Sequence, residues 1–171
     1  FAALVEDSRG SRLQLHDRDG RALREIPTPA AGSITALAAD PRRDELLFIW
    51  QSLFAPPALC RYDVKTSSLT VLQRRVAPDP EEFRLRRARF ATAADTELPL
   101  LLASHRWLKR DGDNPVLLAE LPRVGRNAAP AFSPLLISWL KAGGIWAAPE
   151  RADTAPALLG GLLDDRLPAG M

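Results

Sequence analysis

The sequence has few of the residues from which disulfides and metal sites are built. Its 171 residues include one cysteine, Cys60, and two histidines, His16 and His105. One cysteine cannot form a disulfide within the chain, and no cysteines and histidines stand at the spacing of a zinc site. The lone cysteine favours a reducing compartment, so we expect a cytoplasmic protein, and the sequence predicts no cofactor and no metal.

Long apolar runs and a strong net charge are missing as well. The longest apolar runs, such as residues 99–103, are far shorter than the roughly 20 residues that span a bilayer. The formal net charge of +2 is too small to indicate a nucleic-acid or membrane partner. The chain opens on Phe1 without a signal-like segment, so its first residue looks like a cut and we expect a piece of a longer protein.

Arginine is abundant, with 20 arginines against 3 lysines, a ratio that we attribute to coding bias. The densest group is FRLRRARF at residues 83–90. Alternation along a strand places Arg84 and Arg86 on one face and Arg87 and Arg89 on the other. The four arginines therefore form no single basic stripe, and we expect no nucleic-acid binding.

Turn residues divide the first half of the sequence into short apolar segments at intervals of about ten residues, a pattern typical of antiparallel sheets. The segments predict strands at residues 1–6, 12–17, 22–26, 34–40, 45–52, 58–64 and 69–73. Asp17, Asp19 and Gly20 stand between two of these strands. Because the other ligands of a calcium loop are missing, we expect a hairpin turn there.

A Pro-rich, acidic segment at residues 76–83 predicts a boundary between two domains, residues 1–76 and 77–171. Beyond it, strands are predicted at residues 83–92, 98–107, 116–121 and 145–149, the third of them buried. The turn between the first two is placed at residues 94–96. The fold class expected for the whole chain is mixed β and α/β.

A helix is predicted between the last two of these strands. Ser133 can cap it, Pro134 suits its first position, and Gly143 with Gly144 can end it. The i, i+3, i+4 spacing predicts an inward face made of Leu136, Trp139 and Leu140. A strand, helix and strand in this order favour two parallel strands joined by a right-handed crossover.

Several stretches occur in the order found in prolyl oligopeptidases. They are LQLHDRDGRALREI, ELLFIWQSLFAPPALCRYDVKTSSLTVL, DPEEFRLRRARFATAADTELPLLL, LKRDGDNPVLL and PAFSPLLISWLKAGGIWA. Over residues 1–148 the chain thus resembles this family. The resemblance implies partial β-propeller blades, of the kind that restrict access to short peptides, in residues 1–75. It implies the opening strands and first helix of a truncated α/β-hydrolase domain, the domain that carries a Ser, Asp and His triad, in residues 83–148.

The chain departs from the family pattern where chemistry is expected. Family members follow the strand at 115–118 with Tyr-Gly-Tyr-Gly-Gly-Phe, whose second tyrosine donates to the oxyanion. Leu121 stands at that tyrosine, and Pro122 and Arg123 replace the two glycines after it. Leucine has no donor, and proline fixes φ. After Trp146 the family continues with Asn-Ile-Arg-Gly-Gly-Gly-Glu, of which Arg151 is at most a displaced remnant.

No catalytic serine can be assigned. None of the nine serines stands in a Gly-x-Ser-x-Gly elbow; they are Ser8, Ser11, Ser33, Ser52, Ser67, Ser68, Ser104, Ser133 and Ser138. Ser104 and His105 are adjacent and point to opposite faces of a strand, so they form no dyad. We expect structural roles for His16 and His105. The predicted set of catalytic, cofactor-binding and metal-binding residues is therefore empty.

These departures predict a truncated or degenerate relative of prolyl oligopeptidase. The family activity is serine-type cleavage of short peptides after proline, and we expect the chain by itself to lack it. Two alternatives stay open: a non-catalytic β-sheet module for binding or interaction, and a decayed gene product. Exposed strand edges predict self-association, and the four tryptophans are expected in the core or between domains.

Overall fold

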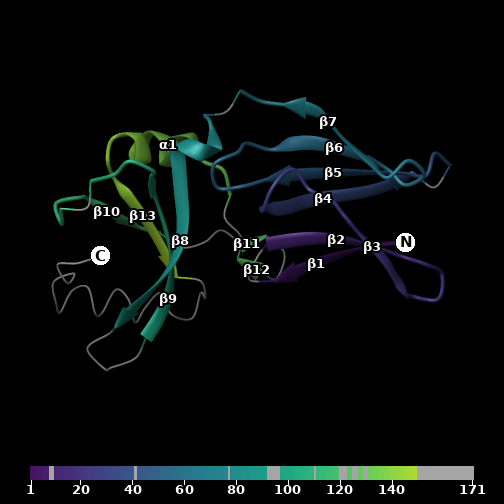
Figure 1. The fold of residues 1–171 in the computed structure, drawn as a ribbon, viewed down its shortest axis with the longest axis horizontal. Coiled ribbons are helices and arrows are strands. Elements are labelled where there is room, and N and C mark those ends of the chain that lie inside the picture. Colours follow the sequence, from purple (N-terminus) through teal and green to yellow (C-terminus); the bar gives the residue numbers. More distant parts are fainter. Residues whose placement is uncertain are drawn as a thin grey trace. The chain divides into compact units, whose positions relative to one another are not determined.

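A computed structural model describes residues 1–7, 10–40, 42–76, 78–91, 97–109, 111–119, 123–124, 127–128 and 131–149 (Figure 1). These residues form mostly antiparallel sheets, with one α-helix. None of the four sheets in this part of the chain closes on itself. The chain divides into two compact units, Phe1–Ala77 with Ala129–Phe132 and Pro78–Ala128 with Ser133–Met171.

Two antiparallel sheets make up the first unit. The smaller has the order β1-β2-β3, with β1 at Ala2–Asp7, β2 at Gly10–His16 and β3 at Ala22–Ile26. The larger has the order β4-β5-β6-β7, with strands at Ser33–Asp40, Glu45–Gln51, Ala58–Asp63 and Ser68–Arg74. Every strand predicted in this half of the sequence is confirmed, with bounds that differ by no more than two residues.

Asp17 builds the turn between β2 and β3. Its Oδ1 accepts hydrogen bonds from the backbone N–H groups of Asp19 and Arg21, each at 2.9 Å. Gly20 adopts a φ of 85°, a conformation that glycine takes without steric cost. The hairpin turn predicted from these residues is therefore confirmed.

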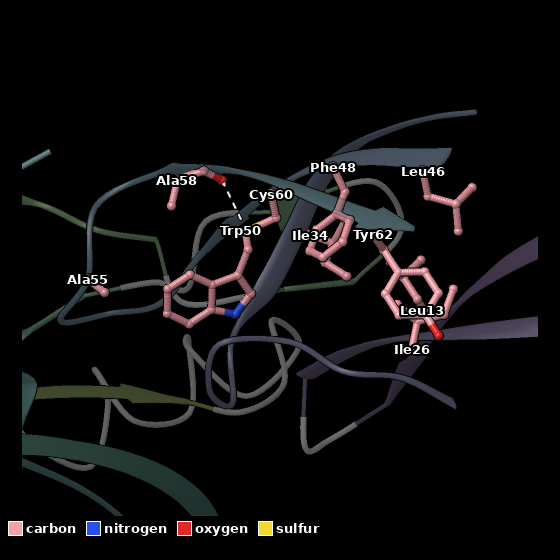
Figure 2. Packing of buried hydrophobic residues seen from close by; sticks show 10 residues of the cluster. All are labelled: Leu13, Ile26, Ile34, Leu46, Phe48, Trp50, Ala55, Ala58, Cys60 and Tyr62. Atoms are coloured by element: carbon pink, nitrogen blue, oxygen red, sulfur yellow. Dashed lines mark hydrogen bonds between the residues drawn. The ribbon is translucent and has the colours of Figure 1, made fainter. Parts of the chain in front are cut away.

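The core of the first unit lies between its two sheets (Figure 2). Along β5 and β6 buried and partly exposed residues alternate strictly, as expected for strands with one covered face. The covered face carries Phe48, Trp50 and Tyr62, which belong to one cluster with Leu13 and Ile26 of the smaller sheet. Burying each such side chain stabilises the unit by roughly 1.5–3 kcal/mol.

Hydrogen bonds connect the smaller sheet to β6, to the residue after β6 and to the residue before β4. The Nε of Arg24 on β3 donates to the hydroxyl of Tyr62 on β6 at 3.1 Å, and an Nη of Arg24 donates to the carbonyl of Val64. The amide of Ser11 donates to the carbonyl of Gly32 at 2.9 Å. These bonds give partners to the amide of Ser11 and the hydroxyl of Tyr62, two residues that are buried at this contact.

A four-stranded sheet with the order β10-β13-β9-β8 forms the centre of the second unit. Its strands are β8 at Phe83–Ala91, β9 at Glu97–His105, β10 at Val116–Leu118 and β13 at Ile145–Pro149. The 3₁₀-helix η1 (Pro80–Glu82) precedes β8, and β11 (Arg123–Val124) pairs with β12 (Asn127–Ala128) separately. The turn expected at residues 94–96 lies outside the described residues.

β10 and β13 run parallel, and α1 (Pro134–Lys141) lies between them in the sequence. The predicted strand, helix and strand with parallel strands are thus confirmed. The other two contacts in this sheet are antiparallel. β9 is buried on both faces, because the four consecutive residues from Leu100 to Ala103 are all less than 10% exposed.

The prediction of a buried strand at residues 116–121 is wrong in two respects. β10 ends at Leu118, and Val116 and Leu117 are 41% and 43% exposed. The reason lies in the strand order, since β10 is the last strand of its sheet and has a neighbour on one side only. The apolar run that was predicted to be a buried strand therefore forms an edge strand of the sheet.

The helix α1 begins and ends as its sequence predicts. The Oγ of Ser133 accepts a hydrogen bond from the amide of Leu136 at 3.4 Å, and Pro134 takes the first helical position. Gly143 follows the helix with a φ of 91°, as is common after a helix C-terminus. Lys141 in the last turn forms an ion pair with Glu82 of η1 at 2.9 Å.

The inward face of α1 differs in one member from the prediction. Leu136 and Leu140 are buried as expected, but the third buried residue is Ile137. Trp139 is only half-buried, and its Nε1 donates to the carbonyl of Ile145 at 3.0 Å. The indole lies so close to Gly144 that a Cβ there would approach it to 2.3 Å. Trp139 thus covers the turn after the helix.

The tryptophans do not share one environment. Trp50 and Trp146 are 3% and 5% exposed and belong to the cores of the two units. Trp107 lies in the turn after β9 and is 78% exposed. Core positions are therefore confirmed for Trp50 and Trp146, whereas Trp107 lies beyond the end of its strand and outside the core of its unit.

Gly32 offers a direct test of the packing in the first unit. A Cβ at this position would lie 2.3 Å from the carbonyl oxygen of Gln51 and 2.6 Å from Nε1 of Trp50. We expect Gly32→Ala to lower the free energy of unfolding of this unit by about 1–3 kcal/mol, because overpacking displaces the backbone or the indole. Alkylation of Cys60, the only cysteine and a buried one, measures the loss in increasing urea.

Ala31→Ser is the control, because Ala31 is exposed and next in sequence. We expect Cys60 to be alkylated at lower urea concentrations in Gly32→Ala than in wild type or Ala31→Ser. Identical urea dependence of all three proteins would contradict the packing described for Gly32.

Candidate functional site

The residues at which the sequence departs from the family pattern follow β10 and β13, at the carboxyl ends of these strands. The parallel register pairs Leu118 with Ala147, and the amide of Ala119 donates to the carbonyl of Ala147 at 2.9 Å. Both strands therefore end at the same edge of the sheet. In sheets with parallel strands, ligands bind beyond this edge.

The described residues at this edge are chemically inert. Residues 116–119 and 145–149 are apolar throughout, and the indole N–H of Trp146 is their sole polar side-chain group. Leu121 and Pro122, which stand in place of the family's oxyanion tyrosine and first glycine, lie outside the described residues, as does Arg151. Arg123 is placed in β11, paired with Ala128. Any chemistry at this edge thus depends on residues beyond the described ones.

Three serine hydroxyls in the described part of the chain stabilise local structure. Ser52 accepts hydrogen bonds from the amides of its own loop at Phe54 and Ala55. Ser138 donates to the carbonyl of Pro134 within α1, and Ser133 caps the same helix. A hydroxyl held in this way is not paired with a general base, as nucleophilic catalysis requires.

Both histidine rings contact neighbouring aromatic residues and form hydrogen bonds with the backbone. The ring of His16 stacks on Phe1 with 5.1 Å between centroids, and its Nδ1 donates to the carbonyl of Gly20 at 3.0 Å. His105 meets the ring of Phe83 edge-on at 5.9 Å, and its Nδ1 accepts from the amide of Trp107 at 3.3 Å. These contacts agree with the structural roles expected for both histidines, which stay predictions.

The adjacent residues Ser104 and His105 form no dyad. Ser104 is opposite Arg84 in the antiparallel register, and His105 is opposite Phe83. Neighbours along a strand point to opposite faces of the sheet. The hydroxyl and the imidazole therefore stand on different sides of β9.

Several acidic side chains serve turns. The carboxylate of Asp63 accepts from the amide of Thr66 at 2.8 Å, and this hydrogen bond lowers the pKa of Asp63. The amide of Asp113 lowers the pKa of Asp111 in the same way. Both groups stay ionised at neutral pH and cannot act as general acids. Among the described residues, no three His, Cys, Asp or Glu side chains gather as a metal site would require.

The remaining candidates carry no chemistry either. Burial raises the pKa of the Cys60 thiol, which keeps it protonated and a poor nucleophile. The arginines of β8 are distributed over both faces of the strand, which pairs with β9 along its whole length. Arg89 forms an ion pair with Glu97 at 2.8 Å. None of the helices in the described ranges has the length and apolarity of a membrane span.

Sequence reasoning missed Arg24, the residue that joins the two sheets of the first unit. It lies 38 positions from its partner Tyr62, and no local pattern connects the two. Among the described residues, the structure adds no catalytic candidate to those examined from the sequence.

Two curated relatives are similar to this chain in sequence. The prolyl endopeptidase of Elizabethkingia miricola is 27% identical over 151 residues, covering 88% of this chain and 21% of the relative. The prolyl endopeptidase of Elizabethkingia meningoseptica is 26% identical over the same length and with the same coverage. The chain thus spans about a fifth of the length of these relatives. No family model matches it.

Solved structures show the same fold over most of the chain. One, from a study of two prolyl endopeptidases, superposes with a TM-score of 0.74 at 22% identity and covers 87% of this chain and 22% of that one. Prolyl oligopeptidase B from Galerina marginata, bound to a 25mer macrocyclization substrate, gives 0.73 at 20% identity, with 88% and 22% covered. By sequence and by fold, the chain is a relative of the prolyl oligopeptidase family.

Proposed function

We propose that the chain forms the junction of a prolyl oligopeptidase-like protein, where the last blades of a β-propeller lead into an α/β-hydrolase domain. Residues 1–76 supply the blades, and residues 77–171 supply the first strands and helix of the hydrolase domain. The substrates of the complete site are short peptides cleaved after proline by a serine nucleophile.

The observation that carries this proposal is the sequence of sheets along the chain. Two antiparallel sheets, packed face to face around one core, are followed by a sheet of order β10-β13-β9-β8 whose outer pair is parallel. The similarity to prolyl endopeptidases extends across both parts, since it covers 88% of the chain. A blade-like part and a hydrolase-like part in this order support a junction between the two domains.

The second element of the proposal is that the 171 residues have no peptidase activity of their own. No serine stands in a nucleophile elbow in the sequence, and Leu121 occupies the position of the oxyanion tyrosine. The hydrogen bonds of Ser133 and Ser138 and the contacts of His16 and His105 support the same conclusion. A triad would have to come from residues that this chain does not contain.

We expect the purified chain to leave a chromogenic Gly-Pro peptide uncleaved, at the rate of a no-protein control. A fluorophosphonate probe, which reacts with activated serines, should leave it unlabelled, while a complete prolyl endopeptidase assayed in parallel is labelled. Labelling that approaches one probe per chain would overturn the proposal. Leu121→Tyr should not restore cleavage, because an oxyanion donor, though worth about 10²–10³ in rate, stabilises nothing without a nucleophile.

A second candidate function, an interaction module without catalysis, is favoured by the strand edges. The outermost strands of the three larger sheets carry large apolar side chains that are at least 37% exposed; they are Leu4, Leu23, Leu37, Val71, Leu72, Leu85, Val116 and Leu117. Edge strands also offer unpaired N–H and C=O groups to another strand. The partner that we propose for these edges is a second copy of the chain.

We expect light scattering after size exclusion to give a mass above that of the monomer, rising with concentration across the micromolar range. Leu23→Lys on the edge strand β3 should shift the population toward the monomer, because a charge at an edge opposes strand pairing. Leu135→Lys is the matched control, since Leu135 is exposed on α1 and away from any edge. A compact monomer that unfolds in one cooperative step would contradict association.

A further inference from the structure

Three pairs of consecutive arginines occur in the sequence, at residues 42–43, 74–75 and 86–87. Arginine is the residue that trypsin-like proteases bind before the bond they cut, through an acidic pocket. Such cuts concentrate in exposed backbone that belongs to no regular structure. The three pairs have the same chemistry, so their surroundings decide which of them a protease can reach.

Arg86 and Arg87 lie within the ladder of β8. They are opposite Leu102 and Leu101 of β9, in the middle of a register that extends over the whole of both strands. Cutting here would require several consecutive strand pairs to separate first. The fold therefore protects this pair.

Arg42 and Arg43 lie in the tight connection between β4 and β5, where Asp40 is already paired with Glu45. The amide of Arg42 donates to a carboxylate oxygen of Asp40 at 3.0 Å, and the amide of Arg43 donates to its carbonyl at 3.2 Å. Their side chains are exposed, but the backbone cannot extend without breaking this turn.

The third pair lies at the end of a strand, where the following backbone is exposed. Arg74 is the last residue of β7 and is opposite Ala58, while Arg75 is exposed and outside any helix or strand. Val76 is 102% exposed. In the described part of the chain no hydrogen bond ties Arg75 or Val76 to another residue.

We propose that the Arg75–Val76 bond is a processing site for an arginine-specific protease of the trypsin type. It lies just before the point where the first unit gives way to the second along the chain. Hydrolysis consumes one water molecule, breaks the peptide C–N bond, and leaves a carboxylate on Arg75 and a free amine on Val76. This inference is independent of the proposed function, because it needs no catalytic residue in the chain.

Limited digestion of the full chain with trypsin, followed by intact mass spectrometry, is the test. The readout is the order of cleavage among the three arginine pairs. We expect the fragment 1–75 to accumulate before any product cut after Arg43 or Arg87. Replacing Arg74 and Arg75 together with glutamine should slow cleavage in this linker at least about tenfold, whereas the same change at Arg42 and Arg43 should leave it unaltered.

Digestion of the urea-denatured chain shows whether the fold determines which of the three arginine pairs is cut first. Once unfolded, the three pairs should be cut at comparable rates, because the protecting ladder and turn are gone. Earlier cleavage after Arg43 or Arg87 in the folded chain would overturn the proposal. So would a preference for Arg75 that persists unchanged in the denatured chain, since the local sequence would then account for it.

Discussion

The packing of β5 and β6 onto the smaller sheet is the interaction on which the first unit depends. Their side chains alternate, so one face of each strand is buried by Leu13 and Ile26 while the other remains partly exposed. Arg24 satisfies the hydroxyl of Tyr62 across the same interface. A shift of one residue in either strand would reverse the faces and place polar residues in the core, and this constraint fixes the register.

The second unit depends on the placement of a parallel strand outside β13. This strand order puts β9 in the middle, buried on both faces, and leaves β10 at the edge. It also brings the carboxyl ends of β10 and β13 together, at the place where a sheet of this kind binds ligands. The arrangement needed for a site is therefore present, while the described residues that reach it are apolar.

Local patterns in the sequence predicted most of this fold. Short apolar segments between turn residues predicted β5 and β6, and Ser133, Pro134 and Gly143 predicted the ends of α1. Non-local pairing decided what the patterns missed: the exposure of β10 follows from its place in the sheet. The bond between Arg24 and Tyr62 spans 38 positions. For the candidate site, the structure confirms only that β10 and β13 are parallel and end at the same edge. The structural roles of the histidines stay predictions, and a position such as Leu121 lies beyond the described residues.

The parallel pairing of β10 with β13 supports both the family relationship and the proposed junction, and NOE spectroscopy on isotopically labelled chain tests it most directly. We expect contacts between amide protons of one strand and Cα protons of the other around Leu117 and Trp146, which are opposite in the register. Contacts between Cα protons should instead join β13 to β9, where the strands are antiparallel. Strong contacts between Cα protons of β10 and β13 would show antiparallel pairing and contradict the proposed junction.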